Sequence, residues 1–187
     1  MKTSATDPIR VDFLPGDAHG LAGRVGMTIA PGKKHHGLTG GWQRDLETDL
    51  LRLREVYRCD LLVTLLEKHE LDRFHVPNLL DLTRTHGMES AWAPIRDGGV
   101  PKAMDSFREL ISRIVAGATA GRTVVIHCRG GLGRTGLVAA SFLVALGRSP
   151  AEAMSIVRQA RPGTVETGEQ ELYIRRFETA WRRHGRR

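Results

Sequence analysis

The stretch from Thr123 to Gly136, Thr-Val-Val-Ile-His-Cys-Arg-Gly-Gly-Leu-Gly-Arg-Thr-Gly, constrains the fold of this chain more than any other part of it. The run Thr123–Ile126 is short, apolar and β-branched, which is typical of a buried strand. Nearly every residue of Leu137–Leu146 is apolar and a good helix former, so a buried helix should follow. The sequence therefore predicts a strand, a glycine-rich turn and a helix.

The turn between this strand and this helix carries residues that suit anion binding. Gly130, Gly131 and Gly133 allow successive backbone N–H groups to converge on one ligand. The helix that begins near Arg134 adds the positive end of its dipole at the same point. Positive charge and aligned N–H groups favour the thiolate form of a cysteine. We therefore expect Cys128 to be a nucleophile beside a bound oxyanion.

Other residues of the turn have predicted roles in binding the same oxyanion. Arg134 lies six residues after Cys128, far enough for the loop to wrap around a tetrahedral group and for the guanidinium to bind two of its oxygens. Thr135 has a hydroxyl that can donate to the sulfur, and His127 is a supporting residue. The predicted phosphate-binding residues are Arg129, Gly130, Gly131, Leu132, Gly133 and Arg134.

Asp97 is the candidate general acid. Ser90–Ile95 has the pattern of a strand, Lys102–Ala120 that of a helix, and the strand Thr123–Ile126 follows. A strand–helix–strand unit of this kind makes the two strands parallel, so their carboxyl ends open on the same edge of the sheet. Asp97 should therefore share an edge with Cys128, on a glycine-containing loop able to close over a substrate.

A cysteine, five intervening residues and Arg-Thr resembles the signature of the protein tyrosine phosphatase superfamily. The stretches Phe74–Leu82, Pro94–Pro101 and His127–Arg134 resemble the kinase-associated dual-specificity phosphatases, the cyclin-dependent kinase inhibitor branch. The resemblance implies the cysteine phosphatase fold and a cysteinyl-phosphate intermediate, without metal or other cofactor.

The resemblance also implies a substrate and further supporting residues. The substrate would be phosphotyrosine, phosphoserine or phosphothreonine in a protein, with a kinase among the candidate partners. In related enzymes a polar residue at the start of the last helix approaches the catalytic loop and helps to position water. Glu166 and Gln170 are the candidates here, and ordinary helix-start chemistry is an equal alternative for both.

Length and composition indicate one globular domain. A chain of 187 residues suits a single phosphatase domain over 1–187, with 1–22 as an irregular N-terminal segment. We expect an α/β fold with a central, mostly parallel sheet of four or five strands and helices on both faces. No apolar run is long enough to span a membrane. The two cysteines are far apart in the sequence, which favours free thiols in a reducing compartment, and we therefore expect the cytoplasm. Cys59 is expected to be structural.

The net charge of +7 raises the question of a nucleic-acid partner. No recognisable nucleic-acid motif accompanies the charge, so the sequence favours no nucleic-acid partner; a positive balance also suits an acidic substrate. Many of the arginines gather at the C-terminus, where they complement a helix dipole; they are Arg175, Arg176, Arg182, Arg183, Arg186 and Arg187.

Hydrophobic periodicity predicts the remaining elements. Strands are expected at Val11–Leu14, Arg24–Ile29 and Leu61–Leu65. A helix within Trp42–Tyr57 should turn Leu46, Leu50, Leu53 and Val56 inward, and Val76–His86 and Ala151–Ala160 should be helical. A final helix, Gly168–Arg183, should place Leu172, Ile174, Phe177 and Trp181 in the core.

Two polar clusters have several possible roles. The basic loop Pro31–Gly37, with Lys33, Lys34, His35 and His36, either lines a substrate groove, binds metal through its histidines or is simply exposed. Glu67, His69 and Glu70, in a predicted loop after the strand Leu61–Leu65, either orient Asp97 or a substrate, hold a metal, or are solvated or cap a helix.

Two other functions compete with catalysis. Gly131, Gly133 and Gly136 match the G-x-G-x-x-G dinucleotide fingerprint, but that fingerprint requires a strand after the helix, whereas Pro150 opens another helix here. A catalytically weak module of the same fold, which binds a phosphorylated ligand, is the second alternative. The presence of nucleophile, arginine and acid together argues against it.

Overall fold

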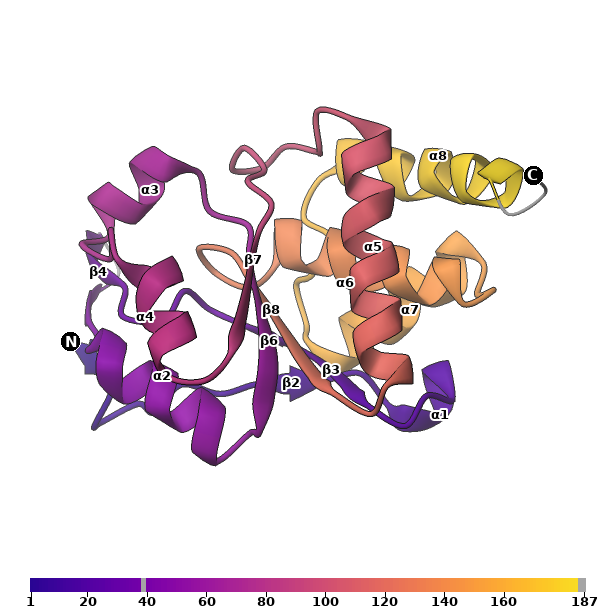
Figure 1. The fold of residues 1–187 in the computed structure, drawn as a ribbon. Helices are drawn as coiled ribbons and strands as arrows, with labels where there is room; N and C mark the ends of the chain where they lie inside the picture. Colours follow the sequence, from indigo (N-terminus) through magenta and orange to yellow (C-terminus); the bar gives the residue numbers. More distant parts are fainter. Residues whose placement is uncertain (38–39, 185–187) are drawn as a thin grey trace.

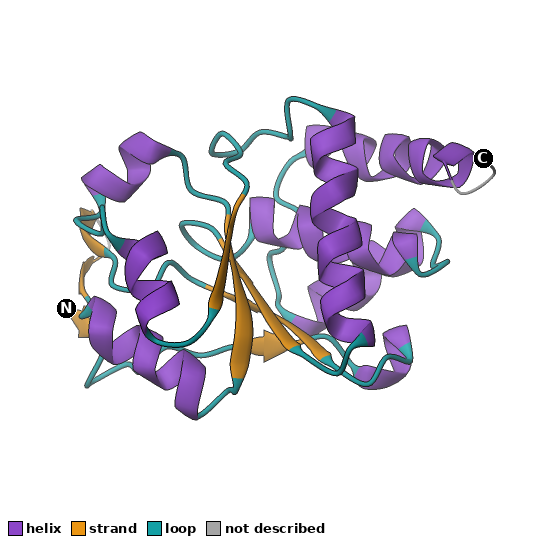
Figure 2. Cartoon of the chain, viewed as in Figure 1, coloured by secondary structure: helices purple, strands orange, loops and turns teal. Residues whose placement is uncertain are grey.

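A five-stranded sheet forms the centre of the molecule (Figures 1 and 2). The computed structural model describes residues 1–37 and 40–184, and the side chains of residues 36–40 and 184 lie outside that description. In spatial order the strands are β2 (Asp12–Phe13), β3 (Arg24–Thr28), β8 (Thr123–His127), β6 (Cys59–Thr64) and β7 (Glu89–Trp92). Only β2, at one edge, is antiparallel to its neighbour. The predicted mostly parallel α/β sheet is confirmed.

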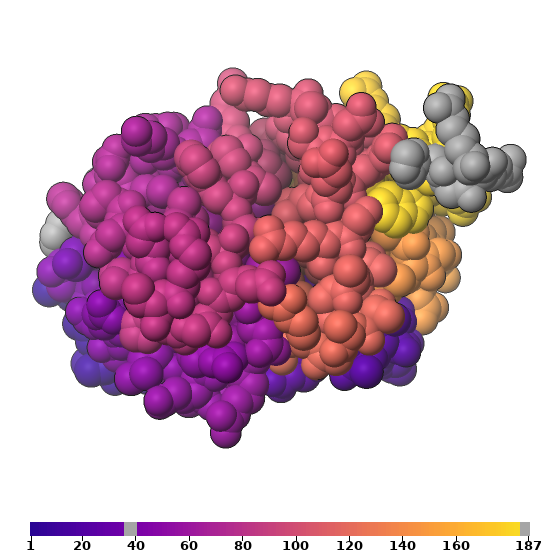
Figure 3. All heavy atoms as spheres, viewed as in Figure 1, coloured from indigo at the N-terminus to yellow at the C-terminus, as the bar shows by residue number. Residues whose placement is uncertain are grey.

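Helices cover both faces of this sheet, as Figure 1 shows. On one side lie α2 (Leu46–Glu55), α3 (Lys68–Arg73) and α4 (Leu79–Thr85), and on the other α5 (Met104–Thr119), α6 (Gly133–Ala145), α7 (Pro150–Ala160) and α8 (Gly168–His184). The short helix α1 (Gly16–His19) precedes β3. In the space-filling view, the middle of the chain covers most of the face that the reader sees, and α8 lies at the right-hand margin of that face (Figure 3).

Burial on both faces explains why the central strands are apolar throughout. In β8, Val124 and Ile126 pack into the core under α5 to α8, whereas Val125 packs into the core under α2 to α4. Successive side chains of a strand point to opposite faces, so a strand between two helical layers needs apolar residues at every position. The apolar run Thr123–Ile126 is therefore the sequence mark of a central strand.

A second, smaller sheet was not predicted. It contains β1 (Lys2–Thr3), β5 (Gly40–Gln43) and β4 (Lys34–Gly37), in that order. The prediction of a loop through Gly37 and of a helix from Trp42 was therefore wrong. The helix begins only at Leu46, because the Asp45 side chain accepts a hydrogen bond from the backbone N–H of Thr48 at 2.8 Å and caps it.

Some helix predictions were wrong in detail. Leu172 is 56% exposed, because it lies two residues from buried Ile174 and therefore on the opposite side of α8. Tyr173, next to Ile174 in the sequence, packs inward instead. Val56 is 56% exposed because α2 has already ended at Glu55.

Several element boundaries also differ from the prediction. Residues 68–73 form α3 rather than a loop, and α4 starts at Leu79, after the turn at Pro77. The strand predicted to reach Ile95 ends at Trp92, although the N–H groups of Ala93 and Ile95 still donate to the carbonyls of Thr64 and Leu65.

The end of the chain excludes the dinucleotide-binding alternative. After α6 the described residues form α7 and α8 and no further strand, so the required strand–helix–strand unit is missing. The helix α7 begins at Pro150, as the sequence predicts, and a capping box of Ser149 and Glu152 starts it. Within the described residues, none of the helices combines the length and the apolar composition that crossing a membrane requires.

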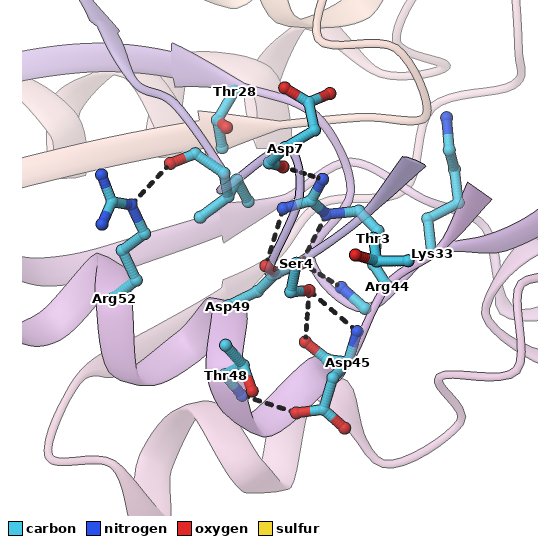
Figure 4. A network of polar contacts seen from close by, with 12 residues as sticks. Thr3, Ser4, Asp7, Thr28, Lys33, Arg44, Asp45, Thr48, Asp49 and Arg52 are labelled. Atoms are coloured by element: carbon cyan, nitrogen blue, oxygen red, sulfur yellow. Dashed lines mark hydrogen bonds and ion pairs between the residues drawn. The ribbon is translucent and has the colours of Figure 1, made fainter. Parts of the chain in front are cut away.

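A buried ion pair joins the small sheet to α2 (Figure 4). The guanidinium of Arg44 binds both carboxylate oxygens of Asp49, with Nε–Oδ2 and Nη2–Oδ1 distances of 2.7 and 2.8 Å. Asp49 Oδ2 also accepts from the backbone N–H of Gly32 at 2.9 Å, and Arg44 donates to the carbonyl of Asp7. Both side chains are only 1% exposed. The pair therefore fixes the backbone of Gly32, directly before Lys33.

We expect Asp49→Ala to destabilise the protein by about 3–5 kcal/mol, because the mutation leaves the Arg44 guanidinium buried without its counter-ion. Urea unfolding at neutral pH measures the change. The matched control is Asp81→Ala, since Asp81 pairs with Arg84 on the surface, where such a pair contributes less than about 1 kcal/mol. Equal losses for the two variants would contradict the assignment.

Candidate active site

The predicted anion-binding turn joins β8 to α6, and two of its glycines are required by close contacts. Gly131 has a φ of 70°, and a Cβ there would lie 2.2 Å from the carbonyl oxygen of Thr28. A Cβ on Gly133 would lie 2.3 Å from Oε2 of Glu166 and 2.9 Å from Nε2 of Gln170. No other residue fits either position without a shift of its neighbours.

Arg161, which the sequence analysis did not single out, holds the turn through its carbonyl groups. Its Nε donates to the carbonyl of Gly131 at 2.7 Å and its Nη2 to that of Gly130 at 3.0 Å. The same guanidinium pairs with Asp12 on β2. Three segments far apart in the sequence therefore meet at this turn. With those two carbonyls engaged by Arg161, the turn keeps its backbone N–H groups for a ligand.

Arg134 is almost completely buried and lies in a network of acceptors. Its guanidinium binds Glu70 through two contacts, Nη1–Oε2 at 2.6 Å and Nη2–Oε1 at 2.9 Å, and Nη2 also lies 2.9 Å from Oδ1 of Asp97. Nη1 donates to the carbonyl of Ile95 at 2.9 Å. Burial alone lowers the pKa of Arg134, but the hydrogen bonds to Glu70 and the nearby negative charges outweigh burial and raise it. The group stays cationic.

Two donors beside this network have no partner within the described part of the chain: Nε of Arg134 and Oγ1 of Thr135. Buried donors are nearly always hydrogen-bonded in proteins, so unsatisfied ones mark a place where a ligand or an ion completes the set. Both belong to residues that the sequence analysis assigned to the bound oxyanion and to the sulfur. The two free donors agree with that assignment.

Asp97 lies at the same edge of the sheet as Cys128, as the predicted parallel strands require. Besides Arg134, its carboxylate contacts Nη1 of Arg129 at 3.1 Å, and about half of the side chain is exposed. Gln170 of α8 fixes the following loop, since its Nε2 donates to the carbonyl of Gly99 at 3.3 Å. Thr167 reaches the carbonyl of Gly98. The acid loop is thus bound to both the turn and α8.

Glu166 and Gln170 both reach the anion-binding turn. The backbone N–H of Glu166 donates to Oε1 of Gln170 at 2.9 Å, which orients the Gln170 amide towards Gly133 and the acid loop. The two suggested roles, helix-start chemistry and approach to the turn, therefore coincide in this pair.

A cavity of about 530 Å³ opens at this edge. It is lined by Lys33, Asp97, Gly98, Cys128, Arg129, Gly130, Leu132, Glu166 and Thr167. The turn, the loop of Asp97 and the start of α8 all contribute to it, so the candidate nucleophile Cys128 and the candidate acid Asp97 face one space of ligand size. Lys33 comes from the basic loop whose role was open, and its neighbour Lys34 does not line this cavity.

Glu70 is a site residue that the sequence left among several interpretations. It caps α3, accepting a hydrogen bond from the backbone N–H of Glu67 at 2.9 Å, and it also holds Arg134. The signal that could have found it is a buried acidic residue three positions into a helix that starts at the carboxyl edge. For the pair His35 and His36, the side chain of His36 lies outside the described residues, as do Arg186 and Arg187.

His127 supports the turn from the end of β8. Burial lowers its pKa to about 3, so the ring is neutral at physiological pH. Its Nδ1 donates to the carbonyl of Cys128 at 3.4 Å, and Nε2 then accepts from the hydroxyl of Thr64 on β6 at 2.8 Å. The ring therefore ties the backbone of Cys128 to the neighbouring strand. The other cysteine, Cys59, is buried at the opposite end of β6, and burial raises its pKa to about 12.

The sequence is similar to proteins of known family. Residues 3–156 match the family model of Cyclin-dependent kinase inhibitor 3 (CDKN3). The Cyclin-dependent kinase inhibitor 3 of Rattus norvegicus is 32% identical over 173 residues, which cover 91% of this chain and 79% of the relative.

Solved structures show the same similarity. A crystal structure of kinase associated phosphatase, with its catalytic-site cysteine substituted by serine, has a TM-score of 0.85 at 29% identity and covers 93% of this chain and 96% of its own. The active form of Tk-PTP has a TM-score of 0.70 at 32% identity, over 90% and 96% of the two chains.

The pKa of His127 predicts a pH-dependent stability. An unfolded histidine takes up a proton near pH 6.5, whereas folded His127 does so only near pH 3, so its contribution is complete above pH 6.5 and is lost as the pH falls towards 3. We expect the difference in unfolding free energy between the wild type and His127→Gln to shrink over this window, measured by urea unfolding. Exposed His69→Gln is the control; a pH-independent difference for His127→Gln would refute the claim.

Proposed function

The chain belongs to the Cyclin-dependent kinase inhibitor 3 family and is a cysteine-dependent protein phosphatase, and we propose that Cys128 is its nucleophile, acting through a cysteinyl-phosphate intermediate. The observation that carries this proposal is the cavity in which Cys128, Asp97 and the anion-binding turn meet. Such a site needs a nucleophile, a group that stabilises the equatorial oxygens and an acid for the leaving oxygen.

The first step is attack of the Cys128 sulfur on phosphorus, in line with the leaving oxygen. An S–P bond forms, the P–O bond to the substrate breaks, and Asp97 gives its proton to the departing oxygen. Backbone N–H groups of residues 129–134 and the side chain of Arg134 stabilise the charge on the equatorial oxygens. The free Nε of Arg134 suits this role. In the second step Asp97 takes a proton from water, which attacks phosphorus and releases phosphate and the thiolate.

Four residues position this machinery in the proposal. Glu70 orients the guanidinium of Arg134 through its two contacts. Gln170 and Glu166, at the start of α8, hold the acid loop and the wall of the cavity where the attacking water enters. Thr135 donates to the Cys128 sulfur once the thiolate leaves, since its hydroxyl has no other partner within the described residues.

The substrate class and partners follow from the family. We propose that the whole of 1–187 acts as one phosphatase domain on phosphotyrosine, phosphoserine or phosphothreonine in a protein. A kinase is a candidate partner, because the relatives are called cyclin-dependent kinase inhibitor and kinase associated phosphatase. Two free cysteines and a thiolate mechanism suit the reducing cytoplasm.

Cys128→Ser should abolish turnover while retaining binding of phosphate, because serine keeps the turn and removes the nucleophilic sulfur. Hydrolysis of p-nitrophenyl phosphate and phosphopeptides, with calorimetry for inorganic phosphate, measures both properties. Cys59→Ala, at the other end of β6, is the control and should keep activity. Rapid hydrolysis by Cys128→Ser would disprove the nucleophile, and a wild type inactive on every substrate would favour a phospho-ligand-binding module.

Asp97→Ala should lower kcat about 10²–10⁴-fold for substrates with poor leaving groups and much less for good ones, because only a basic leaving oxygen needs the proton. A series of aryl phosphates of graded leaving-group acidity gives the measurement. Asp105→Ala is the matched control, because Asp105 is exposed on α5 and does not line the cavity. A uniform loss across the series would assign Asp97 a role in binding or structure instead.

A further inference from the structure

Lys33 is a buried cation that the mechanism above does not use. Its residue is only 5% exposed, and it lines the same cavity as Cys128. A lysine is almost never fully buried unless it is paired. No carboxylate of the described residues lies within ion-pair distance of Lys33, and none contributes to its pKa. Its position therefore requires an explanation.

The surrounding structure places Lys33 firmly. The N–H of Gly32 is held by Asp49 at 2.9 Å, and the carbonyl of Lys33 accepts from the N–H of Arg44 at 3.2 Å. Its ammonium lies 4.4 Å from the centre of the Trp42 ring and 3.4 Å from the carbonyl oxygen of Arg129. Figure 4 shows the side chain extending away from the Arg44–Asp49 pair that fixes its backbone. These contacts fix the position of the Lys33 side chain, unlike that of a lysine that extends freely into solvent.

The charges that face Lys33 are mostly positive. Burial lowers its pKa to about 8; the charge of Arg129 in the turn adds to this, Cys128 opposes it, and Arg44 beside β5 lowers it further. Asp97 and Glu166 also line the cavity, but neither lies within ion-pair distance of Lys33, and Asp97 is paired with Arg129 and Arg134. An ammonium in such a place gains most from an anion in the cavity, and the two anions available there are the Cys128 thiolate and a bound phosphate.

We propose that Lys33 is the counter-ion of the Cys128 thiolate in the free enzyme and of the phosphate dianion in the complex, a role that rests on the phosphatase function proposed above. It adds a third cation, from a segment about 100 residues before the signature turn, to Arg129 and Arg134. Loss of this charge makes the thiolate form of Cys128 less favourable and weakens binding of any tetrahedral dianion.

Alkylation of Cys128 by neutral iodoacetamide tests the first part without any phosphate ester. The rate is measured as a function of pH for the wild type, Lys33→Met, Lys33→Arg and Lys34→Met, with Cys128→Ser as the blank. We expect the midpoint of the profile to rise by about 0.5–1 pH unit in Lys33→Met and to stay near that of the wild type in the other two lysine variants. An unchanged midpoint in folded Lys33→Met would overturn the proposal.

Binding of tungstate, a stable tetrahedral dianion, gives a second test that needs only the conservative variant. Lys33 loses its charge as the pH rises through about 8, whereas arginine keeps its charge. Calorimetry between about pH 7 and pH 9 should therefore show wild-type affinity falling several-fold and Lys33→Arg affinity falling less. Parallel losses in the two proteins would refute the role of Lys33 even if Lys33→Met does not fold.

These readouts separate the two proposals. Absence of phosphatase activity in the wild type, with the shifted alkylation profile still present, would refute the proposed function and retain the pairing of Lys33 with Cys128. Normal phosphatase activity with an unshifted alkylation profile would retain the proposed function and refute the pairing of Lys33 with Cys128.

Discussion

The double contact between Arg134 and Glu70 is the interaction on which the candidate site depends. A guanidinium that is about 1% exposed is stable only if its charge is met, and a fork of two hydrogen bonds to one carboxylate meets it with a defined geometry. Because Glu70 takes both terminal nitrogens, Nε of Arg134 is left for a ligand. Asp97 then docks on the same guanidinium, so the loop of the candidate acid is placed by the arginine that we propose binds phosphate.

The rest of the fold brings distant segments to that point. Arg161 after α7 binds the carbonyls of the turn, Gln170 of α8 binds the loop of Asp97, and Lys33 donates to the carbonyl of Arg129 at the cavity. Each of these contacts joins residues separated by roughly 30–100 positions. The buried Arg44–Asp49 pair positions Lys33 through the backbone of Gly32, whereas Glu70 positions Arg134 through the guanidinium itself.

Sequence patterns predicted the parts of this protein where local chemistry and fold agree. The strand–turn–helix around Cys128, the shared edge of Asp97 and the helix that begins at Pro150 were all visible from residue type and spacing. Patterns did not predict the strands Lys34–Gly37 and Gly40–Gln43, because a short two-residue partner at the N-terminus completes their sheet. The predictions that Leu172 and Val56 face the core were wrong, because apolar spacing alone does not fix the phase or the end of a helix.

By itself the sequence determined the strand–turn–helix around Cys128 and pointed to Cys128, Arg134 and Asp97 as candidate site residues, since each prediction depends on residues that are neighbours or lie on consecutive elements. Only the tertiary structure decided which groups hold those residues in place. Glu70, Arg161 and Lys33 are ordinary charged residues in their own segments, and burial beside a turn from another part of the chain is what requires each to find its partner there. Such requirements arise only when distant segments pack.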